Sequence, residues 1–93
     1  MLESAIQRHV MREARAAGCF VRKVESPNHA GLPDLVIVYQ GRTLWLELKT
    51  DIGRLSALQE RTHQEMRAAG AQVATTYGLD QALKILREFV SQL

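Results

Sequence analysis

Residues 33–49 read Pro-Asp-Leu-Val-Ile-Val-Tyr-Gln-Gly-Arg-Thr-Leu-Trp-Leu-Glu-Leu-Lys, and this stretch decides the fold. The run from Leu35 to Tyr39 is almost continuously apolar and β-branched, as in a strand that is buried on both faces. From Thr43 to Lys49, leucines alternate with other residues, which predicts a second strand with one apolar face and one face that carries polar groups. The three residues between the runs include a glycine, which favours a tight turn. The stretch therefore predicts a β-hairpin.

The position of the turn decides which polar side chains meet across this hairpin. A turn at Gln40-Gly41 places Asp34 directly opposite Glu47, with Cβ atoms about 5 Å apart on one face. A turn at Gly41-Arg42 places Asp34 opposite Lys49 and diagonal to Glu47, about 7 to 8 Å away on the same face. Only an odd loop would turn Asp34 to the other side. Both two-residue turns therefore bring Asp34, Glu47 and Lys49 together.

Two carboxylates that face each other repel, and they stay ionised side by side mainly when a cation lies between them. Mg²⁺ is usually held by one or two carboxylates, with the rest of its shell left to water and substrate phosphate. Asp34 and Glu47 are therefore candidate metal ligands. Lys49 would lie beside the metal, where it could hold or help deprotonate an attacking water, or stabilise charge that develops on a phosphate.

The segments on either side of the hairpin predict three helices and two more strands, from hydrophobic spacing and from glycines at the ends. The expected order is helix 2–17, strand 19–24, strand 35–39, strand 43–49, helix 56–69, strand 71–77 and helix 78–93, with a loop over 26–31. Ser56 and Gln59 have the spacing of a capping box. In the helix that they open, we expect one side to carry Leu55, Leu58, Thr62 and Met66. The pattern predicts an α/β protein with helices that cover a mixed sheet.

Length and composition limit the protein class. The chain has 93 residues, a net charge of +2 and 46% hydrophobic residues, which predicts one folded domain over 1–93 and excludes intrinsic disorder. A chain of this length has a thin core, so a second subunit would stabilise it. No apolar run reaches the length of a membrane span, and the amino end lacks the pattern of a secretory signal. A single cysteine, Cys19, fits a reducing compartment, and we expect the cytoplasm.

The charge pattern permits nucleic acid as a partner. The sequence pI is about 9.0, and nine of the twelve cationic residues are arginines, which contact phosphate oxygens in pairs. Arg8, Arg12 and Arg15 form a stripe on the first helix that is either a solvated face or a clamp for a phosphate backbone. Glycine-rich nucleotide-binding motifs are absent from the sequence.

The hairpin residues resemble a known family, the PD-(D/E)xK nuclease superfamily. The resemblance rests on Pro33-Asp34, twelve intervening residues and then Glu47-Leu48-Lys49. Its context includes Gly31 before the motif, Glu3 on the leading helix and Gln59 on the following helix. The chain is similar to the VRR-NUC branch, also through residues 53–59 and 68–71. Small stand-alone phage and bacterial members of that branch are similar to archaeal Holliday-junction resolvases and pair as homodimers.

This resemblance implies a restriction-endonuclease-like fold and a homodimer that hydrolyses DNA phosphodiesters with Mg²⁺ or Mn²⁺, leaving 5′-phosphate and 3′-hydroxyl ends. It implies that Asp34 and Glu47 bind the metal together with the backbone carbonyl of Leu48. Lys49 would position the water or stabilise charge. Glu3 would be an outer carboxylate, and Gln59 would steady Lys49 or the substrate.

Several alternatives remain open at this point. An acid such as Glu3 is favoured in a first helical turn by the helix dipole alone, and the capping box alone explains Gln59. His63 is expected to be a structural or surface residue. The active site would serve equally well in a nuclease directed at branched DNA, which we prefer, and in one directed at nicks, flaps or ends. The remaining alternative is a catalytically silent nucleic-acid-binding module.

Overall fold

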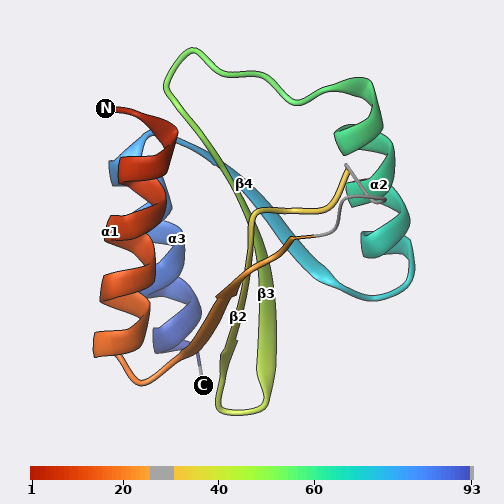
Figure 1. Ribbon diagram of the computed structural model, residues 1–93. Coiled ribbons are helices and arrows are strands. Elements are labelled where there is room, and N and C mark those ends of the chain that lie inside the picture. The colour runs from red at the N-terminus through yellow and green to blue at the C-terminus, as the bar shows by residue number, and fades with distance from the viewer. Residues whose placement is uncertain (26–30, 93) are drawn as a thin grey trace.

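In the computed structural model, which describes residues 1–25 and 31–92, the elements follow the predicted order of helices and strands (Figure 1). Their bounds are α1 (Glu3–Ala16), β1 (Phe20–Lys23), β2 (Leu35–Tyr39), β3 (Arg42–Lys49), α2 (Ala57–Ala68), β4 (Gln72–Tyr77) and α3 (Leu79–Ser91). The expected loop over 26–31 lies outside the described residues except for Gly31. Among the described residues, none of the helices combines the length and the apolar character needed to cross a membrane.

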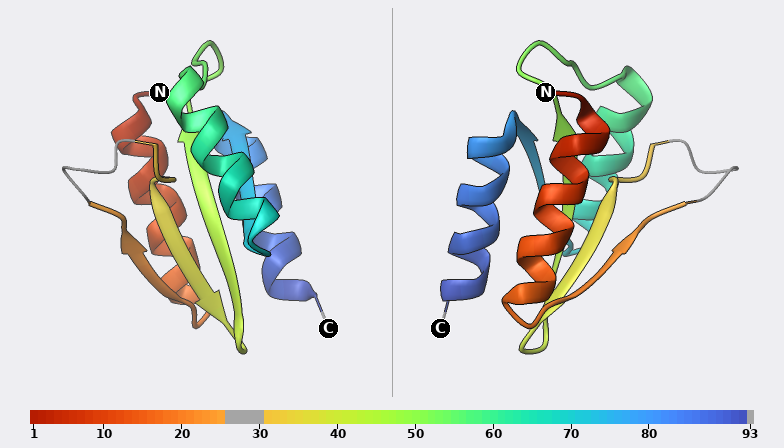
Figure 2. Two further views of the ribbon diagram at one scale, coloured as in Figure 1. Left: turned by 90° about the vertical axis from the view of Figure 1, so that its right-hand side faces the viewer. Right: turned by 60° about the vertical axis from the view of Figure 1, so that its left-hand side comes forward.

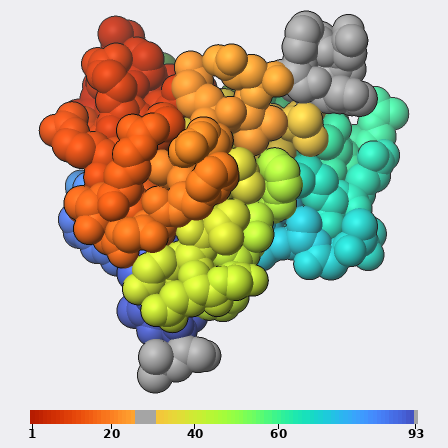
Figure 3. Space-filling model, turned by 60° about the horizontal axis from the view of Figure 1, so that its bottom comes forward, coloured from red at the N-terminus to blue at the C-terminus, as the bar shows by residue number. Residues whose placement is uncertain are grey.

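The four strands form one mixed sheet in the order β1-β2-β3-β4. The first three strands are antiparallel neighbours, whereas β4 runs parallel to β3. A parallel neighbour requires a crossover connection, and α2 provides it. Figure 1 and both views of Figure 2 show α1 and α3 side by side on one face of the sheet and α2 alone on the other. In Figure 3 the turn end of the hairpin comes forward between α1 and α2.

The main core lies between the sheet and the α1–α3 pair. Leu44, Leu46 and Leu48, which alternate along β3, are buried there, as the pattern predicts. The two helices contribute residues at helical spacing to the same core: Ile6, Val10, Ala14, Ala82, Leu86 and Phe89. The intervening residues of β3 are left for the opposite face. The confirmed alternation thus assigns one face of β3 to the core and the other to polar groups.

The turn of the hairpin is Gln40-Gly41, the first of the two turns that the sequence left open. Tyr39 pairs with Arg42, and the antiparallel pairing continues to Leu35 with Leu46. Gln40 and Gly41 both have positive φ, 49° and 77°, as the tight turns of two-residue hairpins require. One further step along this register places Asp34 opposite Glu47.

Helix α2 differs in part from its prediction. The capping box is present: the Ser56 hydroxyl accepts a hydrogen bond from the Gln59 backbone N–H, and the Gln59 side-chain oxygen accepts one from the Ser56 N–H. Of the side that was expected to be apolar, Leu58 is 44% exposed, whereas Leu55, Thr62 and Met66 are half-buried. Within α2, which is described throughout, His63 is the only buried residue. A helix that contacts one sheet face through a polar residue gives little apolar periodicity to detect.

We expect Ser56→Ala to destabilise the protein by about 1 kcal/mol, because the first turn of α2 would lose one side of its capping box. In a domain of this size, that change lowers the Tm by about 4 to 8 °C. Ser4→Ala is the matched control, since Ser4 lies exposed in the first turn of α1, where no side-chain cap is formed. Thermal unfolding followed by circular dichroism measures the difference, and equal Tm values for the two variants would contradict the role of the cap.

Candidate metal centre and active site

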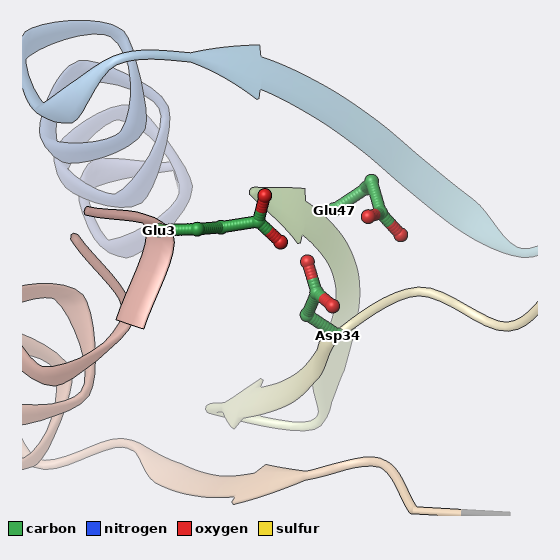
Figure 4. A group of neighbouring side chains, drawn as sticks. All are labelled: Glu3, Asp34 and Glu47. Atoms are coloured by element: carbon green, nitrogen blue, oxygen red, sulfur yellow. The ribbon is translucent and has the colours of Figure 1, made fainter. Parts of the chain in front are cut away.

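Three carboxylates converge at one end of the sheet (Figure 4). Glu3 reaches the site from the first turn of α1, Asp34 from the residue before β2 and Glu47 from β3. One oxygen from each lies within 4.8 Å of the others. Glu3 is exposed, Asp34 is half-buried, and Glu47 is 1% exposed. The site is therefore open on the side of Glu3 and closed beneath Glu47.

The backbone of the hairpin holds Asp34 in this position. Asp34 Oδ2 accepts a hydrogen bond of 2.8 Å from the Leu48 backbone N–H. The Asp34 carbonyl accepts a second bond of 2.8 Å from the Val24 N–H, where the chain leaves β1. Because the Leu48 N–H lies next to Glu47 along β3, the bond fixes the Asp34 carboxylate beside that of Glu47. The sheet thus holds together two groups that repel each other.

Two polar side chains reach one oxygen of Glu47. Lys49 Nζ lies 3.7 Å from Glu47 Oε2, and its side chain is 14% exposed. Gln59 Nε2 donates a hydrogen bond of 3.4 Å to the same oxygen. The amide oxygen of Gln59 is engaged in the capping box, so the box also orients the amide group toward Glu47. In Gln59 the helix cap and a contact with Glu47 are therefore compatible.

His63 is a residue of the site that the sequence did not single out. Its Nε2 lies 3.7 Å from Glu47 Oε1, and the side chain is fully buried. Burial lowers the pKa of His63, and the positive charge of Arg67 adds to this effect. The available signal was spacing, since a residue four positions after Gln59 lies on the same face of a helix. If Gln59 is expected to contact Glu47, this spacing predicts that His63 also faces Glu47.

The electrostatics of the centre favour a bound cation. Burial is the largest of the effects that raise the pKa of Glu47 from 4.5 to about 8. The charge and hydrogen bonding of Asp34 contribute to the same rise, and Lys49 opposes it. A second observation agrees: Glu47 Oε1 is buried without a hydrogen-bond partner. Carboxylate oxygens are the ligands that Mg²⁺ and Mn²⁺ prefer. The donor set of Glu3, Asp34 and Glu47 therefore fits a hard divalent cation.

Leu48, Trp45 and the arginines of α1 differ in how far they are buried. Leu48 is buried with its side chain in the core, while its backbone lies at the site. Trp45, which alternates with the core leucines of β3 and shares the face of Glu47, is half-buried. Arg8, Arg12 and Arg15 are exposed on α1, which agrees with both of their interpretations.

Comparison with known proteins decides the family. A scan against protein-family models finds no match. The chain is 33% identical over 72 residues to "Putative nuclease p44" of Acyrthosiphon pisum secondary endosymbiont phage 1, covering 76% of this chain and 77% of that protein. A solved VRR_NUC domain superposes with a TM-score of 0.83 at 26% identity, over 94% of this chain and 96% of the other. The chain belongs to the VRR-NUC family of nucleases.

A second solved structure shows a likeness in fold. Hjc, a Holliday junction resolvase from Archaeoglobus fulgidus, superposes with a TM-score of 0.59 at 24% identity, over 81% of this chain and 67% of that chain. Together with the solved VRR_NUC domain, it confirms the predicted restriction-endonuclease-like architecture of a mixed sheet with flanking helices. The resemblance to this family in Pro33-Asp34 and Glu47-Leu48-Lys49 is likewise confirmed.

We expect Glu47→Gln to stabilise the metal-free nuclease at alkaline pH. Because the pKa of Glu47 is raised in the folded state, protonation of Glu47 favours folding. This stabilisation is complete below pH 4.5 and is lost as the pH rises through about 8. In chelator at about pH 9, the variant should exceed the wild type in Tm by more than about 4 °C, which corresponds to about 1 kcal/mol, and the gap should close toward pH 5. Thermal scans across this range measure it.

The control for this experiment is Glu65→Gln, which changes an exposed carboxylate on α2, the helix that packs over Glu47. Its Tm should follow that of the wild type at every pH. If Glu47→Gln also runs parallel to the wild type, Glu47 is not the strained carboxylate of the metal-free protein.

Proposed function

We propose that this VRR-NUC nuclease is a metal-dependent DNA endonuclease. The observation that carries the proposal is the convergence of Glu3, Asp34 and Glu47, with Lys49 beside them at the open end of the sheet. This arrangement combines a donor set for a hard cation with a positively charged side chain, which suits metal-assisted hydrolysis of a phosphodiester. The family membership supports the same chemistry.

In this proposal the side chains divide the work. Asp34, Glu47 and the Leu48 carbonyl would hold Mg²⁺ or Mn²⁺, with Glu3 as an outer carboxylate. When bound, the cation would polarise the scissile phosphate and lower the pKa of a water. Lys49 would hold or help deprotonate the attacking water, or stabilise charge on the phosphate. Gln59 would hold the Glu47 carboxylate in place through its hydrogen bond, and Lys49 lies beside that carboxylate. The water oxygen bonds to phosphorus and the 3′ oxygen leaves, which gives 5′-phosphate and 3′-hydroxyl ends.

We expect Asp34→Asn and Lys49→Met to fail in different ways. An asparagine oxygen can still accept the Leu48 N–H bond but gives no negative charge, so Asp34→Asn should lose both metal binding and cleavage. Lys49→Met should bind Mn²⁺ as the wild type does and cleave at least about 100-fold more slowly. Calorimetry measures binding, and a labelled DNA substrate with Mg²⁺, Mn²⁺ or chelator measures cleavage.

The control for the lysine variant is Lys84→Met, because Lys84 lies exposed on α3. It should bind metal and cleave normally. Unchanged cleavage by Lys49→Met would contradict the mechanism. Failure of the folded wild type to cleave with either metal would instead favour a nucleic-acid-binding module.

We further propose that the nuclease acts on branched DNA as a homodimer. One active site cuts one strand, and a two-fold dimer would place two sites symmetrically across a junction. The likeness in fold to a Holliday junction resolvase supports this choice. Large apolar side chains such as Phe20 and Ile52, which are 52% and 87% exposed, are available for contacts between subunits.

We expect symmetric cuts in a labelled four-way junction and little cleavage of a matched linear duplex. Light scattering at micromolar concentration should give twice the chain mass of 10.5 kDa. Equal cleavage of both substrates would retain the endonuclease and contradict the junction preference, and flap and nicked substrates would then identify the alternative. A monomer mass would contradict the dimer.

The cellular setting follows as part of the proposal. We propose that residues 1–93 act as one nuclease domain in the cytoplasm. Cys19 is buried, and burial raises its pKa, so the thiol stays protonated and unreactive, which agrees with a reducing compartment.

A further inference from the structure

The layer between α2 and the sheet contains unpartnered polar atoms. Among the described residues, the buried side-chain atoms that lack a hydrogen-bond partner are Glu47 Oε1, His63 Nδ1, His63 Nε2 and Thr75 Oγ1. Thr75 pairs with Glu47 across the β3–β4 ladder, so both side chains face α2. The four atoms therefore belong to one polar layer, formed by Glu47, His63 and Thr75.

Such a layer is unfavourable for packing alone. A buried polar atom without a partner costs about 1 to 3 kcal/mol, whereas an apolar side chain of similar size at position 63 would carry no such penalty. His63 is nevertheless the one residue of the fully described α2 that is buried against the sheet. Its presence there indicates a requirement other than stability.

The geometry of α2 indicates what that requirement is. Gln59 Nε2 donates to Glu47 Oε2, and His63 Nε2 lies 3.7 Å from Glu47 Oε1. One helix face thus presents one nitrogen to each oxygen of the same carboxylate. A carboxylate has about four lone-pair positions, so two remain for a cation after both oxygens accept a bond. Groups that hydrogen-bond to metal ligands orient them, and their loss lowers metal affinity.

We propose that His63 is a positioning residue, which donates Nε2–H to Glu47 Oε1 and, together with Gln59, locks the Glu47 carboxylate in the orientation that binds the divalent cation. The inference rests on the proposed function, because it assumes that Glu47 binds the metal. The separation of 3.7 Å closes to a hydrogen bond by a small shift, as bonds in an unliganded site tighten when the ligand arrives. His63 itself touches neither metal nor DNA.

The test is Mn²⁺ affinity, measured by calorimetry on the full chain. We expect His63→Leu to lower the affinity about 10- to 100-fold. His63→Gln, whose amide nitrogen reaches about as far as the lost Nε2, should bind nearly as the wild type does, whereas His63→Asn is too short and should bind weakly. His9→Leu, at an exposed histidine of α1, is the control and should leave the affinity unchanged.

A second readout separates positioning from a structural role. In chelator, His63→Leu should be at least as thermally stable as the wild type, because it removes two unpartnered buried atoms. Its cleavage rate should recover at saturating Mn²⁺, since the defect acts through metal affinity. A merely structural histidine would instead give a lower Tm and no recovery.

The outcomes are distinguishable. Equal Mn²⁺ affinity of His63→Leu and the wild type overturns the role of His63 and leaves the nuclease proposal intact. If His63→Leu does not fold, the comparison of His63→Gln with His63→Asn decides, and equal affinities of these two overturn the inference. A folded wild type that does not bind Mn²⁺ overturns the metal-dependent function, and the inference with it.

Discussion

The repulsion between Asp34 and Glu47 is the constraint around which this structure is organised. The β2–β3 register brings the two carboxylates together, and the bond from the Leu48 N–H to Asp34 keeps them there. Burial and the charge of Asp34 raise the pKa of Glu47 to about 8, so ionising both carboxylates at once strains the site electrostatically. A rigid antiparallel ladder is suited to hold such a pair, since moving either group would break several backbone hydrogen bonds. A cation in the site would relieve the strain.

The position of α2 completes the site from the opposite direction. Gly31 lies so close to this helix that an added Cβ would overlap the Thr62 side chain and lie 2.9 Å from the Leu58 carbonyl oxygen. The segment that leads to Asp34 therefore packs against α2, while Gln59 and His63 of the same helix reach Glu47. One crossover helix thus contacts the segments of both candidate ligands. Its capping box orients Gln59, so a local feature of the helix end also serves the site.

The two faces of the sheet have different tasks. The face under α1 and α3 is filled with leucine, isoleucine, valine and phenylalanine side chains, and these provide the main hydrophobic stabilisation. The face under α2 carries Glu47 and Thr75 and packs against His63 of that helix, and each of these three residues has a buried atom without a hydrogen-bond partner. The apolar face offsets the unfavourable burial on the polar face. In a small domain with a thin core, this division leaves room for a charged site without loss of the fold.

Local patterns in the sequence determined the element order, the apolar face of β3 and the candidate residues Asp34, Glu47 and Lys49, because strand alternation and turn chemistry act over a few residues. The tertiary structure alone decided three other features. These are the choice between the two hairpin turns, the distance of Glu3 from Asp34 and Glu47, and the burial of His63. Glu3 reaches the site only because α1 packs on the sheet, and His63 faces Glu47 only because the parallel β4 requires α2 to cross the other face. Such contacts depend on how elements pack, which a one-dimensional pattern does not specify.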